Sequence, residues 1–240
     1  MRRYFSYVDR AIIFDVDGTL AETEETHRKA FNRAFQKAGL SWLWSQDLYR
    51  SLLAVTGGKE RIRHFIQDYG AAGAPKDGQD EFILALHAQK TIEYTKMVRS
   101  GELELRPGVR ALIAAAQNRA YRLAIATTTT PANVDALLAS AFGDAGQGLF
   151  EVICAGDSVP NKKPAPDVYL QALEELDLPA ANCVAIEDSR NGLLSARAAG
   201  IETIVTPGIY TCDENFDEAA LVIDDLESLD FAAIASLLRD

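Results

Sequence analysis

From Arg106 onward, predicted helices and strand-like segments alternate, and this alternation limits the folds open to the chain more than any other feature. The strand-like segments are short and apolar, whereas the helical ones repeat apolar residues at three- and four-residue spacing. In chain order they are helix 108–119, strand 122–127, helix 132–141, strand 150–155, helix 166–177, strand 183–187, helix 191–199 and strand 202–206. Such alternation is typical of a parallel sheet wound with helices, so we predict an α/β core of Rossmann-like type.

A purely helical stretch precedes this core. Residues 22–100 contain four predicted helices with short connections, which favours a small bundle. The run Ala11-Ile12-Ile13-Phe14, ahead of that stretch, has the character of a buried strand of the same sheet. The bundle is therefore predicted to be an insertion. Residues 1–22 and 101–240 would form the core domain, and residues 23–100 an α-helical bundle cap.

Two carboxylates follow the first strand. Asp15 and Asp17 stand at its carboxyl end, where open α/β sheets place their ligand crevices. Residues i and i+2 of an extended segment point the same way, so one carboxylate can attack an electrophile while the other handles a proton. Gly18 permits a sharp turn directly after the pair. An acidic turn without function is the alternative, and we favour a catalytic pair.

Three later segments also carry polar side chains at strand ends or in the following loops. Thr127 and Thr128 precede a helix, where hydroxyl and N–H groups suit phosphate binding, although simple N-capping would give the same pattern. Lys163 lies in a proline-rich loop and can bring an ammonium group to a phosphate, unless it is merely solvated. Glu187 and Asp188 end another apolar strand, and carboxylate oxygens are ligands that Mg²⁺ prefers.

The order of these four motifs resembles that of the haloacid dehalogenase (HAD) superfamily of phosphoryl-transfer enzymes. The matching segments are Asp15-Val16-Asp17-Gly18-Thr19, Thr127, Lys163-Pro164 and Glu187-Asp188-Ser189. The resemblance covers the whole chain, and a helical insertion between the first and second motifs is similar to the subfamily with a helical cap. It implies an enzyme that hydrolyses phosphoric monoesters through an aspartyl-phosphate.

The same resemblance implies the roles of the motif residues. Asp15 would be the nucleophile and Asp17 the general acid and base, with a pKa raised by the neighbouring negative charges. Thr127 and Lys163 would complete the catalytic set by holding the phosphoryl oxygens. The cofactor would be Mg²⁺, held by Asp15, the main-chain oxygen of Asp17, Asp188, and Glu187 either directly or through water.

Several phrases are similar to the CbbY branch of this family, which is found in Calvin-cycle organisms and lies near the β-phosphoglucomutases. They are Thr19 through Glu24, His27-Arg28, Thr56 through Ile62, and Ala126 through Val134. That resemblance implies a small phosphorylated sugar as substrate, namely xylulose 1,5-bisphosphate. The residues expected to bind it are Glu24, His27, Thr56, Gly57, Gly58, Lys59 and Thr128, with Lys59 meeting a distal phosphate. Arg61 and Arg63 are expected to be solvated, although either could join the cap loop that meets the substrate, and Lys162 has no assigned role.

Three other functions remain open. A sugar phosphate mutase of the β-phosphoglucomutase type would use the same motifs but return the phosphoryl group to the bound sugar. A dehalogenase fits poorly because it needs no acid or base at the position of Asp17. A non-catalytic binding protein of this fold would be expected to have lost motif residues, and Asp15, Lys163 and Asp188 are all present.

The charge and composition of the chain argue against several other classes of protein. The formal net charge of −11 at pH 7 argues against nucleic-acid or anionic-membrane partners. No apolar run approaches the ~20 residues of a membrane span. The three cysteines are widely spaced, which predicts neither a disulfide framework nor a zinc site and fits a reducing cytoplasm. We expect a cytoplasmic monomer.

Overall fold

The computed structural model describes residues 9–101 and 103–238. Its strands are β1 (Ala11–Phe14), β2 (Arg122–Ala126), β3 (Val152–Cys154), β4 (Cys183–Glu187), β5 (Glu202–Val205) and β6 (Leu221–Val222). Its α-helices are α1 (Glu24–Lys37), α2 (Gln46–Leu52), α3 (Gly58–Asp68), α4 (Gln79–Arg99), α5 (Val109–Asn118), α6 (Pro131–Phe142), α7 (Asp167–Leu176), α8 (Arg190–Ala198) and α9 (Phe231–Leu237). Two 3-10 turns, η1 (Gly143–Gly148) and η2 (Ala180–Asn182), complete the described elements.

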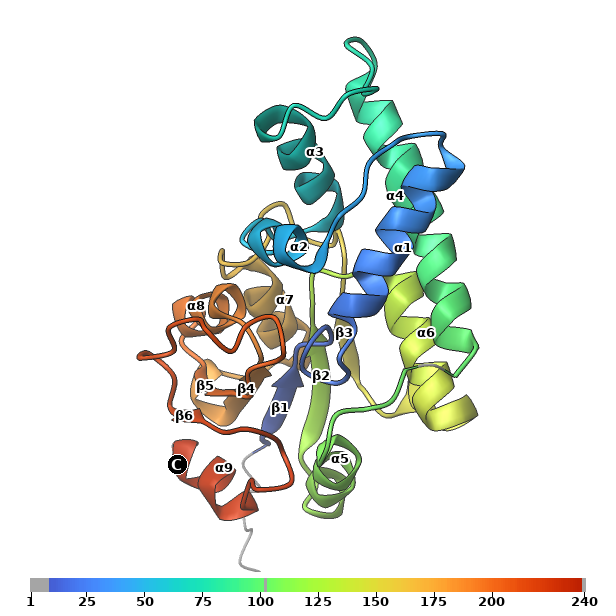
Figure 1. Ribbon diagram of the computed structural model, residues 1–240. Helices are drawn as coiled ribbons and strands as arrows, with labels where there is room; N and C mark the ends of the chain where they lie inside the picture. The colour runs from blue at the N-terminus through green and yellow to red at the C-terminus, as the bar shows by residue number, and fades with distance from the viewer. Residues whose placement is uncertain (1–8, 102, 239–240) are drawn as a thin grey trace, which may run out of the picture.

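The described strands form one six-stranded sheet in the order β3-β2-β1-β4-β5-β6, and every neighbouring pair is parallel. Phe14, the last residue of β1, is in register with Ile125 of β2 and Ile186 of β4. These three strands therefore end at the same edge of the sheet. The predicted α/β fold with a parallel Rossmann-like sheet is confirmed, and the edge that carries the predicted motifs is the one below the cap helices (Figure 1).

Alternate residues of the strands feed two hydrophobic layers. Ile12 and Phe14 pack on one face of the sheet with residues of α5, α6 and α9, whereas Ala11 and Ile13 pack on the other face with α7 and α8. Because both faces are covered, the central strands are apolar throughout, which is typical of parallel sheets. The sheet thus holds its carboxyl edge rigidly.

The helices of the inserted stretch share a core of their own. Its aromatic centre includes Phe31, Phe35, Trp42 and Trp44, which are all buried and packed mainly edge to face or tilted. Helix α4 continues downward alongside α6 of the α/β part (Figure 1). The division of the chain at residues 22/23 and 100/101 stays a prediction, and residues 1–8 of the predicted core segment lie outside the described residues.

The two crossings between core and cap lie side by side. Ala21 forms an antiparallel bridge with Leu105, and the N–H of Arg106 donates to the carbonyl of Leu20. The buried Arg106 guanidinium donates to the carbonyl oxygens of Gly18 and Thr206. This arginine thereby joins the first motif to the loop that follows β5.

The end of the chain departs from the sequence-based expectation. Strand β6 and helix α9 were not predicted. A two-residue strand is too short to show an alternating pattern, and α9 owes its start to Asp230, whose side chain accepts from the N–H of Ala232. In the described part of the chain, no helix is both long and apolar enough to cross a bilayer.

We predict that Trp44→Ala destabilises the protein by about 3–5 kcal/mol, because it empties a fully buried aromatic site. The neighbouring Leu43→Ala is the control, since Leu43 is 72% exposed and its loss should change stability by less than about 0.5 kcal/mol. Urea unfolding followed by circular dichroism measures both. Equal effects of the two substitutions would contradict the packing described here.

Candidate active site

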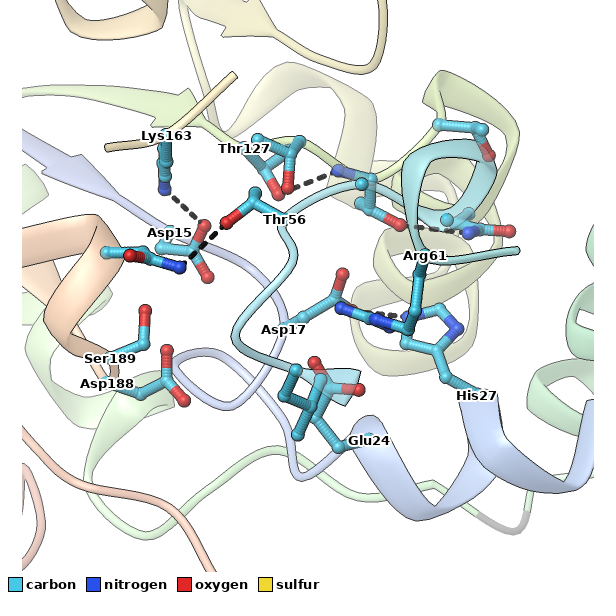
Figure 2. A pocket seen from close by; sticks show the side chains of 18 of the residues that line it. Asp15, Asp17, Glu24, His27, Thr56, Arg61, Thr127, Lys163, Asp188 and Ser189 are labelled. Carbon is cyan, nitrogen blue, oxygen red and sulfur yellow. Dashed lines mark hydrogen bonds and ion pairs between the residues drawn. The ribbon is translucent and has the colours of Figure 1, made fainter. Parts of the chain in front are cut away.

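The predicted motif residues meet in one cavity between the sheet edge and the cap. Its volume is about 100 Å³. The predicted site residues that line it are Asp15, Asp17, Glu24, His27, Thr56, Gly57, Gly58, Thr127, Thr128, Lys163 and Asp188. Figure 2 shows the core side chains Asp15, Lys163 and Asp188 on one side and the cap side chains Glu24, His27 and Arg61 on the other. Thr56 of the cap reaches across to the core side chains. Glu187 and Lys59 do not line the cavity and are described below.

Lys163 is the central cation of the core half. Its ammonium group donates to Asp15 Oδ1 at 2.6 Å, to Glu187 Oε1 at 2.6 Å and to the carbonyl of Ala126 at 2.9 Å. All three of its hydrogens are therefore used, although the side chain is buried. Burial alone would lower the pKa of Lys163, but Asp15 and Glu187 outweigh it and raise that pKa. The lysine stays charged and fixes the Asp15 carboxylate.

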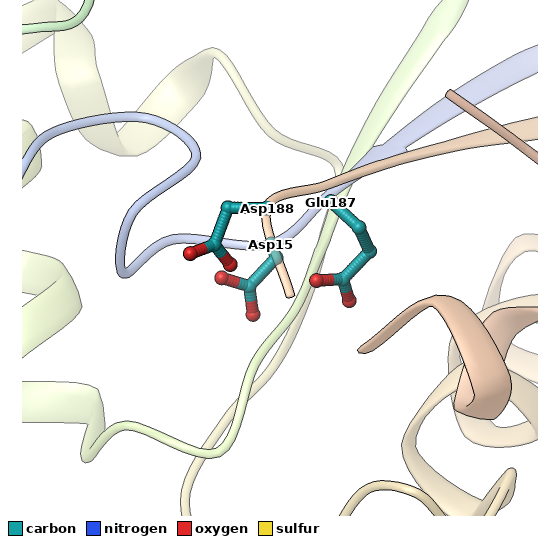
Figure 3. A group of neighbouring side chains, drawn as sticks. All are labelled: Asp15, Glu187 and Asp188. Atoms are coloured by element: carbon teal, nitrogen blue, oxygen red, sulfur yellow. The ribbon is translucent and has the colours of Figure 1, made fainter. Parts of the chain in front are cut away.

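Three buried carboxylates surround this cation. Oxygens of Asp15, Glu187 and Asp188 lie within 4.8 Å of one another. Figure 3 shows the Asp15 and Asp188 carboxylates close together, with Glu187 on the other side of Asp15. Burial raises the pKa of Asp15 to about 8 against the opposing charge of Lys163, and burial with the neighbouring carboxylates raises that of Asp188. If ionised, three carboxylates and one ammonium leave two uncompensated negative charges, which matches a divalent cation.

The donor set of this cluster fits a hard metal ion. All candidate ligands are carboxylate oxygens, and Glu187 Oε2 is buried without a hydrogen-bond partner. Glu187 Oε1, however, accepts from both Lys163 and the Tyr169 hydroxyl, at 2.6 and 2.5 Å. Asp15 and Asp188 are therefore the residues best placed to hold an ion, while Glu187 chiefly balances the charge of Lys163.

Two glycines allow the carboxylates to approach the backbone this closely. Gly18 has φ +81°, and a Cβ there would lie 2.1 Å from Asp188 Oδ2. At Gly192 a Cβ would lie 1.9 Å from Glu187 Oε2. Any other residue would push the acidic side chains out of the cluster. The first and fourth motifs therefore depend on glycine for space, and the first motif also depends on it for its backbone conformation.

Asp17 has different surroundings. Its Oδ1 accepts from the Thr23 hydroxyl at 2.6 Å and lies 2.9 Å from His27 Nε2, as Figure 2 shows for His27. The other ring nitrogen, Nδ1, lies 2.8 Å from Lys90 Nζ, whose pKa burial lowers to about 8. Because an ammonium group has donors only, Nδ1 accepts and Nε2 carries the hydrogen donated to Asp17. The ring of His27 also stacks on Tyr94.

The charge state of Asp17 differs from the sequence-based expectation. Burial alone would raise its pKa, but His27, Thr23 and Lys90 outweigh burial and lower the pKa below its usual range. The expected rise through repulsion by Asp15 is therefore wrong for the ligand-free arrangement. Asp17 is an ionised acceptor here, and serving as an acid would require it to leave these partners.

The threonine loop after β2 is held from within. Thr127 is buried, and its hydroxyl accepts from the N–H of Thr129 at 3.3 Å. Asn133, in the first turn of α6, donates to the Thr129 hydroxyl at 2.9 Å. Thr128 is half-buried and lines the cavity. The loop therefore sets hydroxyl groups and the start of α6 against the cavity, opposite Asp188.

The cap contributes an arginine to the cavity. Arg61 is buried, which corrects the expectation that it is solvated, and it donates to the Tyr49 hydroxyl at 3.0 Å. That hydroxyl in turn donates to Glu24 Oε2 at 2.7 Å. Arg63 meets the expectation, since it is exposed and pairs with Asp80 at 2.5 Å. Glu24 and Arg61 thus act as a linked pair on the cap side.

The cap loop of residues 56–59 is seated on the core. Thr56 Oγ1 accepts from the Asn191 side chain at 3.0 Å, and Gly57 has φ +96°. Lys59 lies beyond the cavity lining and pairs with Asp157, in the loop after β3. Asp157 pairs in addition with Lys162 at 2.7 Å, which gives Lys162 a partner that the sequence had not suggested.

Sequence reasoning missed Lys90, His87 and Tyr49 in this region. Lys90 is buried beside His27, and His87 lines the cavity next to Gly58. Their helical spacing on α4 shows that they share a face, but only the packing of α1 against α4 shows that this face is directed at Asp17. A polar pair three residues apart inside a long helix is a weak signal on its own.

Comparison with known proteins agrees with this geometry. Residues 10–200 match the model of the haloacid dehalogenase-like hydrolase family. Protein CbbY of Rhodobacter capsulatus is 52% identical over 228 residues, which covers 95% of this chain and 98% of that protein. The resemblance to the CbbY branch is therefore confirmed.

Solved structures give the same result. The crystal structure of a CbbY mutant from Rhodobacter sphaeroides in complex with xylulose-(1,5)bisphosphate has a TM-score of 0.89 and 46% identity, covering 94% of this chain and 99% of that one. β-Phosphoglucomutase from Clostridium difficile shares the fold with a TM-score of 0.78 at 21% identity, covering 96% and 97%. The chain belongs to the haloacid dehalogenase-like hydrolase family and is an enzyme of that family.

Proposed function

We propose that the protein is a Mg²⁺-dependent phosphatase of a small sugar phosphate, xylulose 1,5-bisphosphate being the favoured substrate. The observation that carries the proposal is the unequal setting of two neighbouring carboxylates. Asp15 is fixed by Lys163 beside Asp188, whereas Asp17 is held by Thr23 and His27. One carboxylate is thereby suited to attack and the other to exchange a proton.

The first step is transfer of the phosphoryl group to Asp15. A carboxylate oxygen of Asp15 bonds to phosphorus, and the bond between phosphorus and the sugar oxygen breaks. The electron pair leaves with that oxygen, which takes a proton from Asp17. Lys163, Thr127 and Thr128 would hold the phosphoryl oxygens, since their side chains line the cavity around Asp15.

The second step is hydrolysis of the aspartyl-phosphate. Asp17, now ionised, takes a proton from a water molecule whose oxygen attacks phosphorus. The bond between Asp15 and phosphorus breaks, which restores the carboxylate and releases phosphate. The low pKa of Asp17 beside His27 and Thr23 favours the ionised state in which Asp17 must begin this second step. Proton donation in the first step requires Asp17 to part from these partners and approach the substrate.

The implied cofactor fits the residues that are present. Asp15 and Asp188 would hold Mg²⁺ with the main-chain oxygen of Asp17, and Glu187 would contribute through water or through its charge. When bound, the ion supplies positive charge that offsets the carboxylates and the phosphate.

Substrate choice is assigned to the cap. Support comes from the R. sphaeroides relative, whose crystal structure holds xylulose-(1,5)bisphosphate. Arg61, Glu24 and the backbone of Gly57 and Gly58 line the cap side of the cavity, far along the pocket from the attacking carboxylate. An arginine with partly used donors suits a phosphate, and Glu24 suits sugar hydroxyl groups. His27 would act on the substrate mainly through Asp17.

A mutase would use the same first step. Free phosphate and isomerised sugar phosphate distinguish the two activities when a panel of sugar mono- and bisphosphates is scored by kcat/KM. We expect phosphate release, with the highest kcat/KM for the five-carbon bisphosphate. Isomerised product without free phosphate would replace the proposal by the mutase.

Asp15→Asn should lower phosphate release by at least about a thousandfold, because an amide is a poor nucleophile. The fold should persist, since asparagine keeps the size of the side chain. The control is Asp135→Asn, an exposed change on α6 that should leave turnover unchanged. Near-wild-type turnover of Asp15→Asn in Mg²⁺ would refute the nucleophile assignment.

Asp17→Ala should separate the two steps. With a nitrophenyl phosphate, whose leaving group needs no proton, the variant should still phosphorylate Asp15 but hydrolyse the intermediate slowly. Mass spectrometry of the quenched protein should then detect phosphoenzyme, whereas wild type should show little. If the variant turns over at the wild-type rate, Asp17 is not the base.

The metal-free protein should lose stability as pH rises. Folding raises the pKa of Asp15 to about 8 and also that of Asp188, so the folded state binds more protons than the unfolded state between roughly pH 4 and 8. This stabilisation is complete below the unfolded pKa and is lost as pH approaches 8. In EDTA, Tm should therefore fall between pH 5.5 and 8.5, each kcal/mol corresponding to roughly 2–4 °C.

Saturating Mg²⁺ should raise Tm more at pH 8.5 than at pH 5.5, because ionised carboxylates bind the ion. Asp188→Asn should reduce both the pH dependence in EDTA and the gain from Mg²⁺. A gain in Tm that is the same at both pH values would argue against this cluster as the metal site.

A further inference from the structure

We infer that Asp157 is a positioning residue that holds the cap closed over the cavity through its ion pair with Lys59. The inference rests on the proposed function. Lys59 comes from the first turn of α3 in the cap, and Asp157 from the loop after β3 in the core. The pair therefore joins the cap to the core at the rim of the cavity.

The ammonium group of Lys59 is occupied at the rim of the cavity. It pairs with Asp157 Oδ2, and Lys59 is absent from the residues that line the cavity, unlike its neighbours Gly57 and Gly58. In the ligand-free arrangement Lys59 contacts the core, and its contact with a distal phosphate stays a prediction. Because Lys59 pairs with the core, its charge stabilises the closed cap relative to the open one.

Core residues orient Asp157 for its contact with Lys59. Its Oδ1 accepts from Lys162 at 2.7 Å, and Lys162 donates in addition to the carbonyl of Gly156. Hydrogen bonds from Lys162 and Lys59 lower the pKa of Asp157 to about 2, so the carboxylate is ionised throughout the working range. Because Lys162 precedes the site lysine Lys163, the same loop supplies the catalytic cation and also supports Asp157. We call the ion pair of Lys59 and Asp157 the latch.

A second contact fixes the other end of the cap loop. The side-chain amide of Asn191, on α8, donates to Thr56 Oγ1 at 3.0 Å and to the carbonyl of Ala54 at 3.3 Å. The loop is therefore attached to the core on both sides of Gly57 and Gly58, which lie over the cavity. Opening the cap above this cavity would break these contacts together with the ion pair of Lys59 and Asp157.

Breaking the latch should have a measurable effect on kcat/KM. Asp157 is 61% exposed at its side chain, so the ion pair is screened by water and salt. We expect Asp157→Asn and Lys59→Met each to lower kcat/KM by roughly threefold to fivefold, mainly through a higher KM, as befits one exposed ion pair. The double variant should be no worse than either single one, and the effect should shrink in high salt.

A charge reversal separates this role from direct substrate binding. Lys59→Asp alone should lower kcat/KM further, because two carboxylates then oppose each other across the rim. Combining it with Asp157→Lys and Lys162→Met should recover most of the loss, since the pair is rebuilt in the opposite sense and no lysine then faces the new ammonium group. If Lys59 binds a distal phosphate instead, the reversed pair stays impaired, and the loss is confined to bisphosphate substrates.

The matched control is the pair of Arg63 and Asp80, which is exposed and lies wholly within the cap between α3 and α4. Arg63→Asp combined with Asp80→Arg should leave KM and its salt dependence unchanged. An equal effect of this reversal would mean that surface charge in general, and not the latch, is responsible.

Hydrogen exchange tests the inference independently of activity. Asp157→Asn should speed amide exchange in the first turn of α3 and in residues 155–162, with no change in α5. If the wild-type protein releases no phosphate from any sugar phosphate, the proposed function fails while this measurement still decides the latch. Unchanged exchange in Asp157→Asn would overturn the inference even in an active enzyme.

Discussion

The site depends on one buried ammonium group. Lys163 donates to Asp15, Glu187 and a main-chain carbonyl, and no water is needed to satisfy it. A buried charge without partners would cost several kcal/mol, so the lysine and the carboxylates require each other. One lysine among three carboxylates nevertheless leaves negative charge in excess. That excess suits the cluster to a cation better than to a closed ion-pair network.

Parallel topology explains why so much of this site could be predicted from sequence. Asp15, Thr127 and Asp188 each follow a strand directly, and Glu187 is the last residue of β4. Strands β1, β2 and β4 end at one edge of the sheet. Once alternation indicates a parallel sheet, residues at strand ends must converge. The positions of the core motifs at strand ends therefore predicted that Asp15, Thr127 and Asp188 lie close together, and all three line the cavity. The cap division rests on the helical stretch that precedes the alternating segments, the chemical roles rest on resemblance, and both stay predictions.

The cap was less predictable because helix packing sets its inner face. Arg61 was expected in solvent and lies buried, since α3 turns it toward Tyr49 and Glu24. Lys90 gave no signal, because its importance arises from a contact with His27 that is 63 residues away. The direction of the pKa shift of Asp17 in the ligand-free arrangement was not predicted for the same reason. The sequence suggested a neighbouring negative charge, whereas the folded cap provides two hydrogen-bond donors, Thr23 and His27.

The distribution of charge bears on how a phosphorylated substrate is chosen. The chain carries a formal net charge of −11, which repels phosphate at long range, while Lys163, Lys90 and Arg61 are buried around the cavity. Screening in cell-like salt limits any field to about 8 Å, so these cations act on a substrate only after it has entered. On the proposed function, discrimination between sugars would belong to a closing step in which the cap brings Arg61 and Glu24 over the ligand. Such an enzyme would gain selectivity from contacts that exist only when the cap is shut, and the strength of the cap–core contacts would set how readily wrong substrates escape.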